Sequence, residues 1–241
     1  MKPVAIIGGT GIGSRLAAMG GTPILVPTED GPLRAKRIEH DGQTLYLIQR
    51  HSAGHKTPPH KINYKAMARG AKALGVAGVI SSAAVGCLRT EWPVGSFIAC
   101  SDFFDFTYRR LTMWDREVKH VDFTMPFDPA VRSALLSSAS KLGMSLQENG
   151  LYVNLDGPRY ETPGEIEMLR KLGGDIVGMT AATEAIAFRE LSVPYACLAV
   201  VTNHAAGMGA AELGHEEVVE VMEAAGEKAV RLFLEAARGL G

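Results

Sequence analysis

The chain has 241 residues, of which 46% are hydrophobic and 21% charged, and its formal net charge at pH 7 is −1. This composition is ordinary for a globular protein, and the near-neutral charge gives no electrostatic reason to expect nucleic acid or an anionic membrane as a partner. No apolar run approaches the roughly 20 residues that span a bilayer. The three cysteines lack metal-ligand spacing, so we expect no metal site, no disulfide framework and a reduced, cytoplasmic enzyme.

Apolar, strand-like runs alternate with helical stretches along the chain, without an internal repeat or a linker. Strands are predicted at residues 3–7, 23–27, 33–40, 44–48, 76–80, 95–100, 150–155, 175–180 and 195–201. Helices are predicted at residues 63–74, 129–142, 164–172, 183–190 and 216–238. This alternation predicts a single α/β domain over residues 1–241.

The first strand breaks into the glycine-rich turn 8–13. Glycines let backbone N–H groups approach an anion closely, and Thr10 adds a hydroxyl. The spacing does not match a dinucleotide fingerprint, because Ser14 occupies the third glycine position, and the Gly-Lys-Ser/Thr of an ATP-binding loop is absent. The turn therefore favours a small phosphate as ligand, with a plain tight turn as the alternative.

The strand 44–48 ends shortly before Arg50 and His51. An arginine at a strand end can grip an anion through its planar fork of donors, whereas a solvated basic loop is the alternative. Small residues follow the strand 76–80 at positions 81–86, which lets backbone amides approach a ligand. Residues 108–127 form a long, aromatic-rich irregular segment containing His120, and such segments are often functional or lie at a subunit contact.

Polar residues also follow the strand 195–201, which reads as a buried parallel strand. Ligands of open α/β sheets bind at the carboxyl ends of such strands, and Asn203 follows directly there. Its amide offers a donor and an acceptor together, which suits a heterocycle that carries an oxo group beside an N–H. The alternative is that Asn203 only begins a turn.

Several motifs along the chain, taken in order, resemble the trimeric purine nucleoside phosphorylases and methylthioadenosine phosphorylases. They are Gly8-Gly9-Thr10-Gly11, Arg50-His51, Ala83-Ala84-Val85-Gly86, Gly157-Pro158-Arg159-Tyr160-Glu161-Thr162, Gly178-Met179-Thr180 and Thr202-Asn203. The resemblance implies a mixed central β-sheet flanked by helices and a homotrimer, and it leaves a dimer of trimers open. It also implies phosphorolysis of a purine nucleoside to the free base and a pentose 1-phosphate. Inorganic phosphate is then a co-substrate, and no metal or organic cofactor is expected.

The resemblance also assigns roles to individual residues. Phosphate is expected against Thr10, Arg50, His51, the backbone at Ala83 and the hydroxyl of Thr180. The ribose is expected over Met179, and the purine near Ala84 and Val85 with the ring of Tyr160 packed on it. His120 of a neighbouring subunit is expected to close over the 5′ end. Core packing is the alternative role for Met179 and Tyr160.

The base-reading positions favour a 6-oxopurine. In the resemblance, enzymes that take 6-aminopurines carry aspartates at the positions of Asn203 and Ala205. An amide can donate to O6 and accept from N7–H, whereas a carboxylate only accepts. Glu161 matches the carboxylate that accepts from N1–H of a 6-oxopurine. Unpaired polar groups would penalise the wrong base edge heavily.

The preferred substituent at the 5′ position of the nucleoside is inferred from one residue. His215 matches the position that holds a histidine toward the 5′-hydroxyl in inosine and guanosine phosphorylases, although a helix cap is its alternative role. We therefore predict phosphorolysis of inosine and guanosine, with Asn203, Glu161 and His51 as the catalytic residues. Chain length and the Arg50-His51 loop leave 5′-methylthioinosine or 5′-methylthioadenosine open as substrates. A phosphate-binding module without catalysis and an NAD-dependent oxidoreductase are the rivals from other classes, the latter disfavoured by the glycine spacing.

Overall fold

The computed structural model describes residues 1–51, 57–209 and 214–241. Its centre is a mixed sheet of nine strands in the order β2-β3-β4-β1-β5-β8-β7-β6-β9. The strands are β1 (Val4–Gly8), β2 (Thr22–Val26), β3 (Leu33–His40), β4 (Gln43–Gln49), β5 (Gly78–Cys87), β6 (Phe97–Asp105), β7 (Gln147–Asn154), β8 (Ile176–Gly178) and β9 (Tyr195–His204). The predicted α/β class with a mixed sheet flanked by helices is confirmed.

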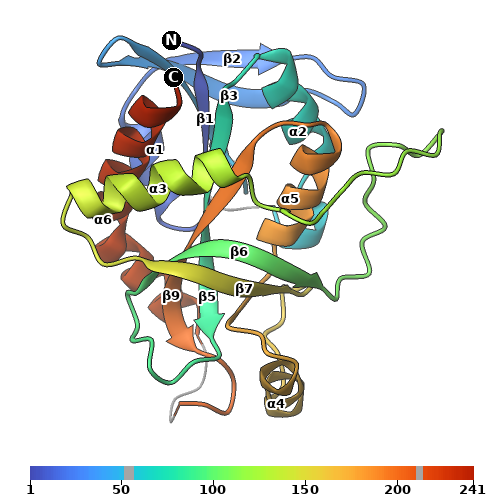
Figure 1. Ribbon diagram of the computed structural model, residues 1–241, viewed down its shortest axis with the longest axis vertical. Coiled ribbons are helices and arrows are strands. Elements are labelled where there is room, and N and C mark those ends of the chain that lie inside the picture. Colours follow the sequence, from blue (N-terminus) through green and yellow to red (C-terminus); the bar gives the residue numbers. More distant parts are fainter. Residues whose placement is uncertain (52–56, 210–213) are drawn as a thin grey trace.

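The last strand in this order, β9, pairs with two strands, antiparallel to β6 and parallel to β5. The strands β5, β8, β7, β6 and β9 therefore close into a barrel, and β1 to β4 extend the sheet from β5 (Figure 1). Closure removes the edges that these strands would otherwise leave unpaired.

Helices cover both faces of the sheet (Figure 1). One face packs against α2 (Tyr64–Ala73) and α5 (Ala181–Glu190), and the opposite face against α1 (Ile12–Ala18), α3 (Pro129–Lys141) and α6 (His215–Leu240). A short 3₁₀ turn, η1, spans Pro59–Lys61. No helix of the described residues is long and apolar enough to cross a membrane.

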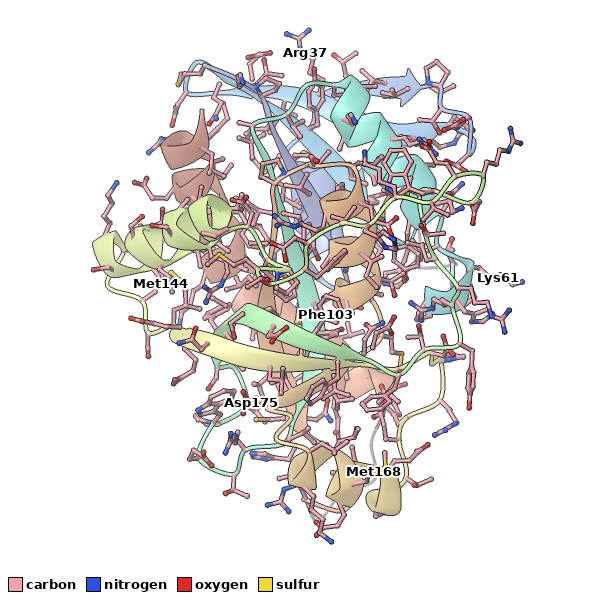
Figure 2. All side chains as sticks on the ribbon, turned by 45° about the vertical axis from the view of Figure 1, so that its right-hand side comes forward. Arg37, Lys61, Phe103, Met144, Met168 and Asp175 are labelled. Carbon is pink, nitrogen blue, oxygen red and sulfur yellow. The ribbon has the colours of Figure 1, made fainter. Side chains whose placement is uncertain are left out.

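Helix α4 (Pro163–Lys171) stands apart from these layers and ends the loop that carries Tyr160 and Glu161 (Figure 1). It begins with a capping box, in which Thr162 and Glu165 bond each other's backbone N–H, at 3.2 and 2.7 Å. Its outer side carries Met168, which is half-exposed (Figure 2). Ile166 and Leu169 of α4 pack against Val153 of β7 and Val177 of β8. The cap therefore fixes the end of the 156–162 loop on a helix that is packed against the barrel.

The prediction for the strand 76–80 was wrong in extent, because β5 continues through the small residues to Cys87. Ser81 and Ser82 look like loop residues but are fully buried, and both are hydrogen-bonded, Ser81 to the Tyr195 hydroxyl at 2.7 Å. Buried polar groups with partners are tolerated inside a sheet. The helix α1 was not predicted, because it begins inside the glycine-rich turn 8–13, and glycine disfavours helix. Residues 106–127 contain no helix or strand, and this stretch includes the whole of the predicted irregular segment 108–127.

A gap in strand pairing opens the sheet beside β5. On that side β1 pairs with β5 as far as Ser81, and β8 joins it only at Gly86. Residues 82–85 thus have β9 on one side and no strand on the other within the described chain. The Ser82 carbonyl there accepts from Arg50 Nη1 at 2.7 Å. No strand covers the other backbone groups on the open side, which leaves room for the expected approach of a ligand although this stretch is not a loop.

Candidate active site

A cavity of about 460 Å³ lies at this gap. It takes its walls from the ends of β1, β4, β5, β8 and β9 and from the loop before α4. Among its lining residues are Thr10, Arg50, His51, Ala83, Ala84, Val85, Tyr160, Glu161, Met179, Thr180 and Asn203. These are all of the predicted site residues except His120 and His215.

His120 and His215 are the two predicted residues that are not seen in the cavity wall. His120 is exposed in the 106–127 segment, where its predicted contact would require a neighbouring subunit. Helix α6 begins at His215, but the placement of the His215 side chain is not among what the structure describes. Val218, about one turn further along the same helix, does line the cavity.

Glycines bring the first turn close to Arg50. A Cβ on Gly9 would lie 2.5 Å from Arg50 Nη1, so a side chain there would displace the guanidinium. The backbone N–H of Gly9 donates to Ser82 Oγ at 3.1 Å. A Cβ on Gly8 would lie 2.6 Å from the Cα of Gly13, so this part of the pattern serves the tight packing of the turn itself.

Arg50 is almost completely buried and is held by Glu184 of α5. Its Nε and Nη2 donate to the two carboxylate oxygens of Glu184 at 2.5 and 2.9 Å, and Nη1 donates to the Ser82 carbonyl at 2.7 Å. Burial disfavours the charged guanidinium, but the charge and hydrogen bonds of Glu184 outweigh it and raise the pKa of Arg50. Arg50 is therefore a cation under all conditions in which the protein is folded.

Glu184 was missed in the sequence. It is fully buried on a helix that is otherwise mostly alanine and apolar. The available signal was its position, because a charged side chain on the core-facing stripe of a helix is rarely left without a partner.

His51 and Thr180 line the cavity near this cation. The Nδ1 of His51 lies 2.8 Å from the Thr57 carbonyl, and a carbonyl can only accept, so Nδ1 carries the hydrogen. Thr180 precedes α5 but its side chain makes no capping hydrogen bond to the helix. Its hydroxyl is therefore not committed to the helix end, where an anion would be favoured by the helix dipole.

Asn203 and Glu161 also line the cavity. The amide Nδ2 of Asn203 donates to the His204 carbonyl at 3.0 Å, and its Oδ1 accepts from the Thr202 hydroxyl at 2.9 Å. These two bonds fix the orientation of the amide while leaving one N–H and one lone pair for a ligand. Glu161 is 8% exposed, and burial raises the pKa of its carboxyl against the smaller effect of its own backbone N–H.

Met179 is packed against the loop that carries Tyr160 and Glu161. A Cβ on Gly157 would lie 2.2 Å from Met179 Sδ, and Gly157 has a φ of 63°, so glycine is needed there on both counts. Arg109 connects Met179 to this loop. Its Nη1 donates to the Met179 carbonyl and its Nη2 to the Asp156 carbonyl, both at 2.9 Å.

The sequence did not single out Arg109 as functional, and nothing in its local pattern distinguishes it from exposed Arg110 beside it. The other residues that line the cavity were not among the predicted site residues. They are Thr57, Pro58, Pro59, Gly86, Pro158, Val177, Gly178, Thr202 and Val218. Most of these are apolar or small residues whose role follows only from their position.

Comparisons with known proteins agree with this geometry. Residues 3–238 match the family model described as the phosphorylase superfamily. A 6-oxopurine nucleoside phosphorylase of Pyrococcus furiosus is 41% identical over 245 residues, covering 98% of this chain and 92% of the relative. A probable S-methyl-5′-thioinosine phosphorylase of Methanopyrus kandleri is 42% identical over 235 residues, covering 97% and 91%.

Among solved structures, a mutant adenosine/methylthioadenosine phosphorylase of Schistosoma mansoni, in complex with methylthioadenosine, superposes with a TM-score of 0.91. It is 25% identical, and the match covers 99% of this chain and 91% of that one. The similarity thus extends over nearly the whole length of the fold.

Proposed function

Given that the chain belongs to the phosphorylase superfamily, we propose that it catalyses the phosphorolysis of 6-oxopurine ribonucleosides such as inosine and guanosine. The products are the free purine base and ribose 1-phosphate. The observation that carries this proposal is the lining of one cavity by a buried cation, Arg50, and by a base-reading pair, Asn203 and Glu161. The 41% identity to a relative named as a 6-oxopurine nucleoside phosphorylase supports it.

The base-reading pair suits a 6-oxopurine edge. The amide of Asn203 has one N–H for O6 and one lone pair for N7–H after its bonds to Thr202 and His204 are counted. The carboxylate of Glu161 accepts from N1–H. A 6-aminopurine would instead present an amino donor and an N1 acceptor to this pair, and the N1 lone pair would face a carboxylate, which repels it.

The reaction needs no nucleophile from the protein. A phosphate oxygen attacks C1′ of the ribose as the C1′–N9 bond breaks, and the electron pair of that bond leaves with the purine. Held by Arg50, His51, Thr10, Thr180 and the backbone at Ala83, the phosphate is close to the sugar, and its negative charge stabilises the oxocarbenium-like transition state. The leaving purine takes up a proton at N7 from solvent water, which neutralises its negative charge, and Asn203 accepts the hydrogen bond of that N7–H.

A second candidate substrate is 5′-methylthioinosine. Pro58, Pro59 and Val218 give part of the cavity wall an apolar character that suits a methylthio group. The relative named as a probable S-methyl-5′-thioinosine phosphorylase, at 42% identity, supports this candidate. The predicted position of His215 toward a 5′-hydroxyl favours inosine. Membership of the superfamily removes the support for an NAD-dependent oxidoreductase.

The proposed assembly is a homotrimer. Large apolar side chains are exposed on the irregular 106–127 segment, with Tyr108 at 95% and Val118 at 87% exposure. Several large apolar side chains exposed on one segment suit a subunit contact. In such a contact His120, on the same segment, would reach the 5′ end of a neighbour's cavity. Sedimentation equilibrium tests the assembly, and a monomer at working concentration would contradict it.

The function is tested by measuring the free base released from inosine, guanosine, 5′-methylthioinosine, adenosine and 5′-methylthioadenosine, each with and without phosphate. Phosphate-dependent release from inosine or guanosine supports the main proposal. A wide preference for 5′-methylthioinosine keeps the 6-oxopurine argument but removes that for His215. A preference for either 6-amino nucleoside contradicts the roles of Asn203 and Glu161, and phosphate binding without any turnover points to a non-catalytic module.

A further inference from the structure

We infer that Glu184 is a positioning residue for phosphate, acting through Arg50 by fixing which N–H groups of the guanidinium face the cavity. This inference rests on the proposed function, because phosphate is the anion that Arg50 is proposed to hold. Glu184 itself does not line the cavity. Its effect on a ligand therefore has to pass through the side chain that it binds.

The hydrogen bonds determine what Arg50 can offer. A guanidinium has five N–H donors in a rigid plane. Nε and Nη2 each give one to Glu184, and Nη1 gives one to the Ser82 carbonyl, so two of the five remain, one on Nη1 and one on Nη2. Two donors on adjacent nitrogens form the fork that matches two oxygens of a phosphate.

Glu184 is itself held from behind. The Tyr195 hydroxyl donates to its Oε2 at 2.7 Å, and the same hydroxyl lies 2.7 Å from Ser81 Oγ. Burial, together with the charge of Glu184, raises the pKa of Tyr195, so the hydroxyl keeps the proton that it donates. The Tyr195 ring stacks on the ring of Phe188, which lies on α5 as Glu184 does, with 5.0 Å between the ring centroids. The carboxylate is thus fixed from both ends.

Burial protects the ion pair of Arg50 and Glu184 from competition by water. The side chains of Arg50 and Glu184 are 2% and 0% exposed, so water does not replace either partner. Without Glu184, the guanidinium would turn toward the strongest acceptor within reach instead of presenting its fork to the cavity. An ion pair that served only the core would stabilise the fold without regard to which ligand binds. A positioning role affects phosphate in particular.

The test compares Michaelis constants for phosphate and for the nucleoside in Glu184→Gln. Glutamine keeps the shape but has one oxygen, so its amide N–H group would face a donor of Arg50 or Tyr195. We expect the KM for phosphate, and its Kd by calorimetry, to rise about ten-fold or more, as loss of one hydrogen bond to a charged group implies. The KM for inosine should stay within about two-fold of wild type at saturating phosphate.

Glu190→Gln is the matched control. Glu190 is a carboxylate on the same helix whose oxygens accept from Thr112 and from the backbone N–H of Met113, away from the cavity. Its substitution should leave the Michaelis constant for phosphate unchanged. The coupling between the two residues is tested in the Arg50→Lys variant. If Glu184 acts only through Arg50, adding Glu184→Gln to that variant should raise the Kd for phosphate little further.

A Glu184→Gln protein that folds but binds phosphate as wild type does would overturn the inference, as would equal losses for phosphate and nucleoside. Should Glu184→Gln fail to fold, Tyr195→Phe removes only one bond from Glu184 and should raise the phosphate Kd by a smaller factor; an unchanged Kd contradicts the inference. Phosphate binding that depends on Glu184 in a protein without phosphorolysis would remove the proposed function and keep this inference.

Discussion

Arg109 Nη1 donates to the backbone carbonyl of Met179 at 2.9 Å, which ties the irregular 106–127 segment to the strand end that lines the cavity. The same guanidinium forms an ion pair of 3.0 Å with Asp156 and donates to Thr183 Oγ1 at 2.9 Å. Its side chain is 12% exposed, so the contacts are largely shielded from water. One side chain thereby sets the distance between Met179 and the loop that carries Glu161.

Replacing Arg109 by methionine should therefore loosen the nucleoside half of the cavity. We expect the KM for inosine to rise about ten-fold, with the phosphate Kd little changed, because the lost bonds are each worth about 1–3 kcal/mol. Thermal unfolding should occur several degrees lower. The exposed neighbour Arg110 provides the control, and Arg110→Met should change neither quantity. Unchanged inosine kinetics in Arg109→Met would show that the cavity does not depend on this contact.

Asn203→Asp tests the base reader. Aspartate can only accept hydrogen bonds, so it loses the donor to O6 and gains an acceptor for a 6-amino group. The ratio of kcat/KM for adenosine to that for inosine should increase by at least about ten-fold. Competition between the two nucleosides in one reaction measures this ratio directly. Inosine turnover and preference that survive intact would mean that Asn203 does not read the base.

Glu161→Gln should move activity and stability in opposite directions. Burial raises the pKa of Glu161 in the folded protein, so the folded state binds this proton more tightly than the unfolded state. Stability from this group is present at low pH and is lost as the pH rises from the ordinary carboxyl pKa through the raised one. Removing the charge should therefore raise the melting temperature at pH 7, in a scan of the ligand-free protein. A lower melting temperature for this variant would contradict the assignment.

The same substitution should lower kcat/KM for inosine, because N1–H loses its charged acceptor. In the wild type, the acid limb of the pH profile of kcat/KM should lie above the ordinary carboxyl pKa, since the pKa of Glu161 is raised and the ionised carboxylate is the stronger acceptor for N1–H. Glu161→Gln should remove that limb. A profile with the same acid limb in both proteins would assign the limb to another group.

His215→Ala tests the prediction for the 5′ end, which the sequence alone supports. If His215 bonds the 5′-hydroxyl, its loss should reduce kcat/KM for inosine by about ten-fold or more and leave that for 5′-deoxyinosine nearly unchanged. Parallel assays of the two substrates give the comparison. Equal losses on both would remove His215 from the 5′ pocket and favour the methylthio alternative.

Local sequence determined much of this protein. Apolar runs and turn residues predicted the α/β class and nearly all the elements, because the spacing of apolar residues along the chain indicates which face of a helix or strand is buried. The motifs of the family resemblance also named many residues that line the cavity, from Thr10 in the first turn to Asn203 in β9. The predicted strand ends did not, because Ala83 to Val85 and Asn203 lie inside strands that run further than their apolar cores.

Only the tertiary structure decided what holds those residues in place. Glu184 lies 134 positions from Arg50, and Arg109 lies 70 positions from Met179, so neither pairing follows from spacing. The extent of β5 was likewise undecided, because Ser81 and Ser82 become strand residues only when Tyr195 and Gly9 satisfy their hydroxyls. Buried polar groups take their partners from wherever the fold brings them, and that information exists only once the chain is packed.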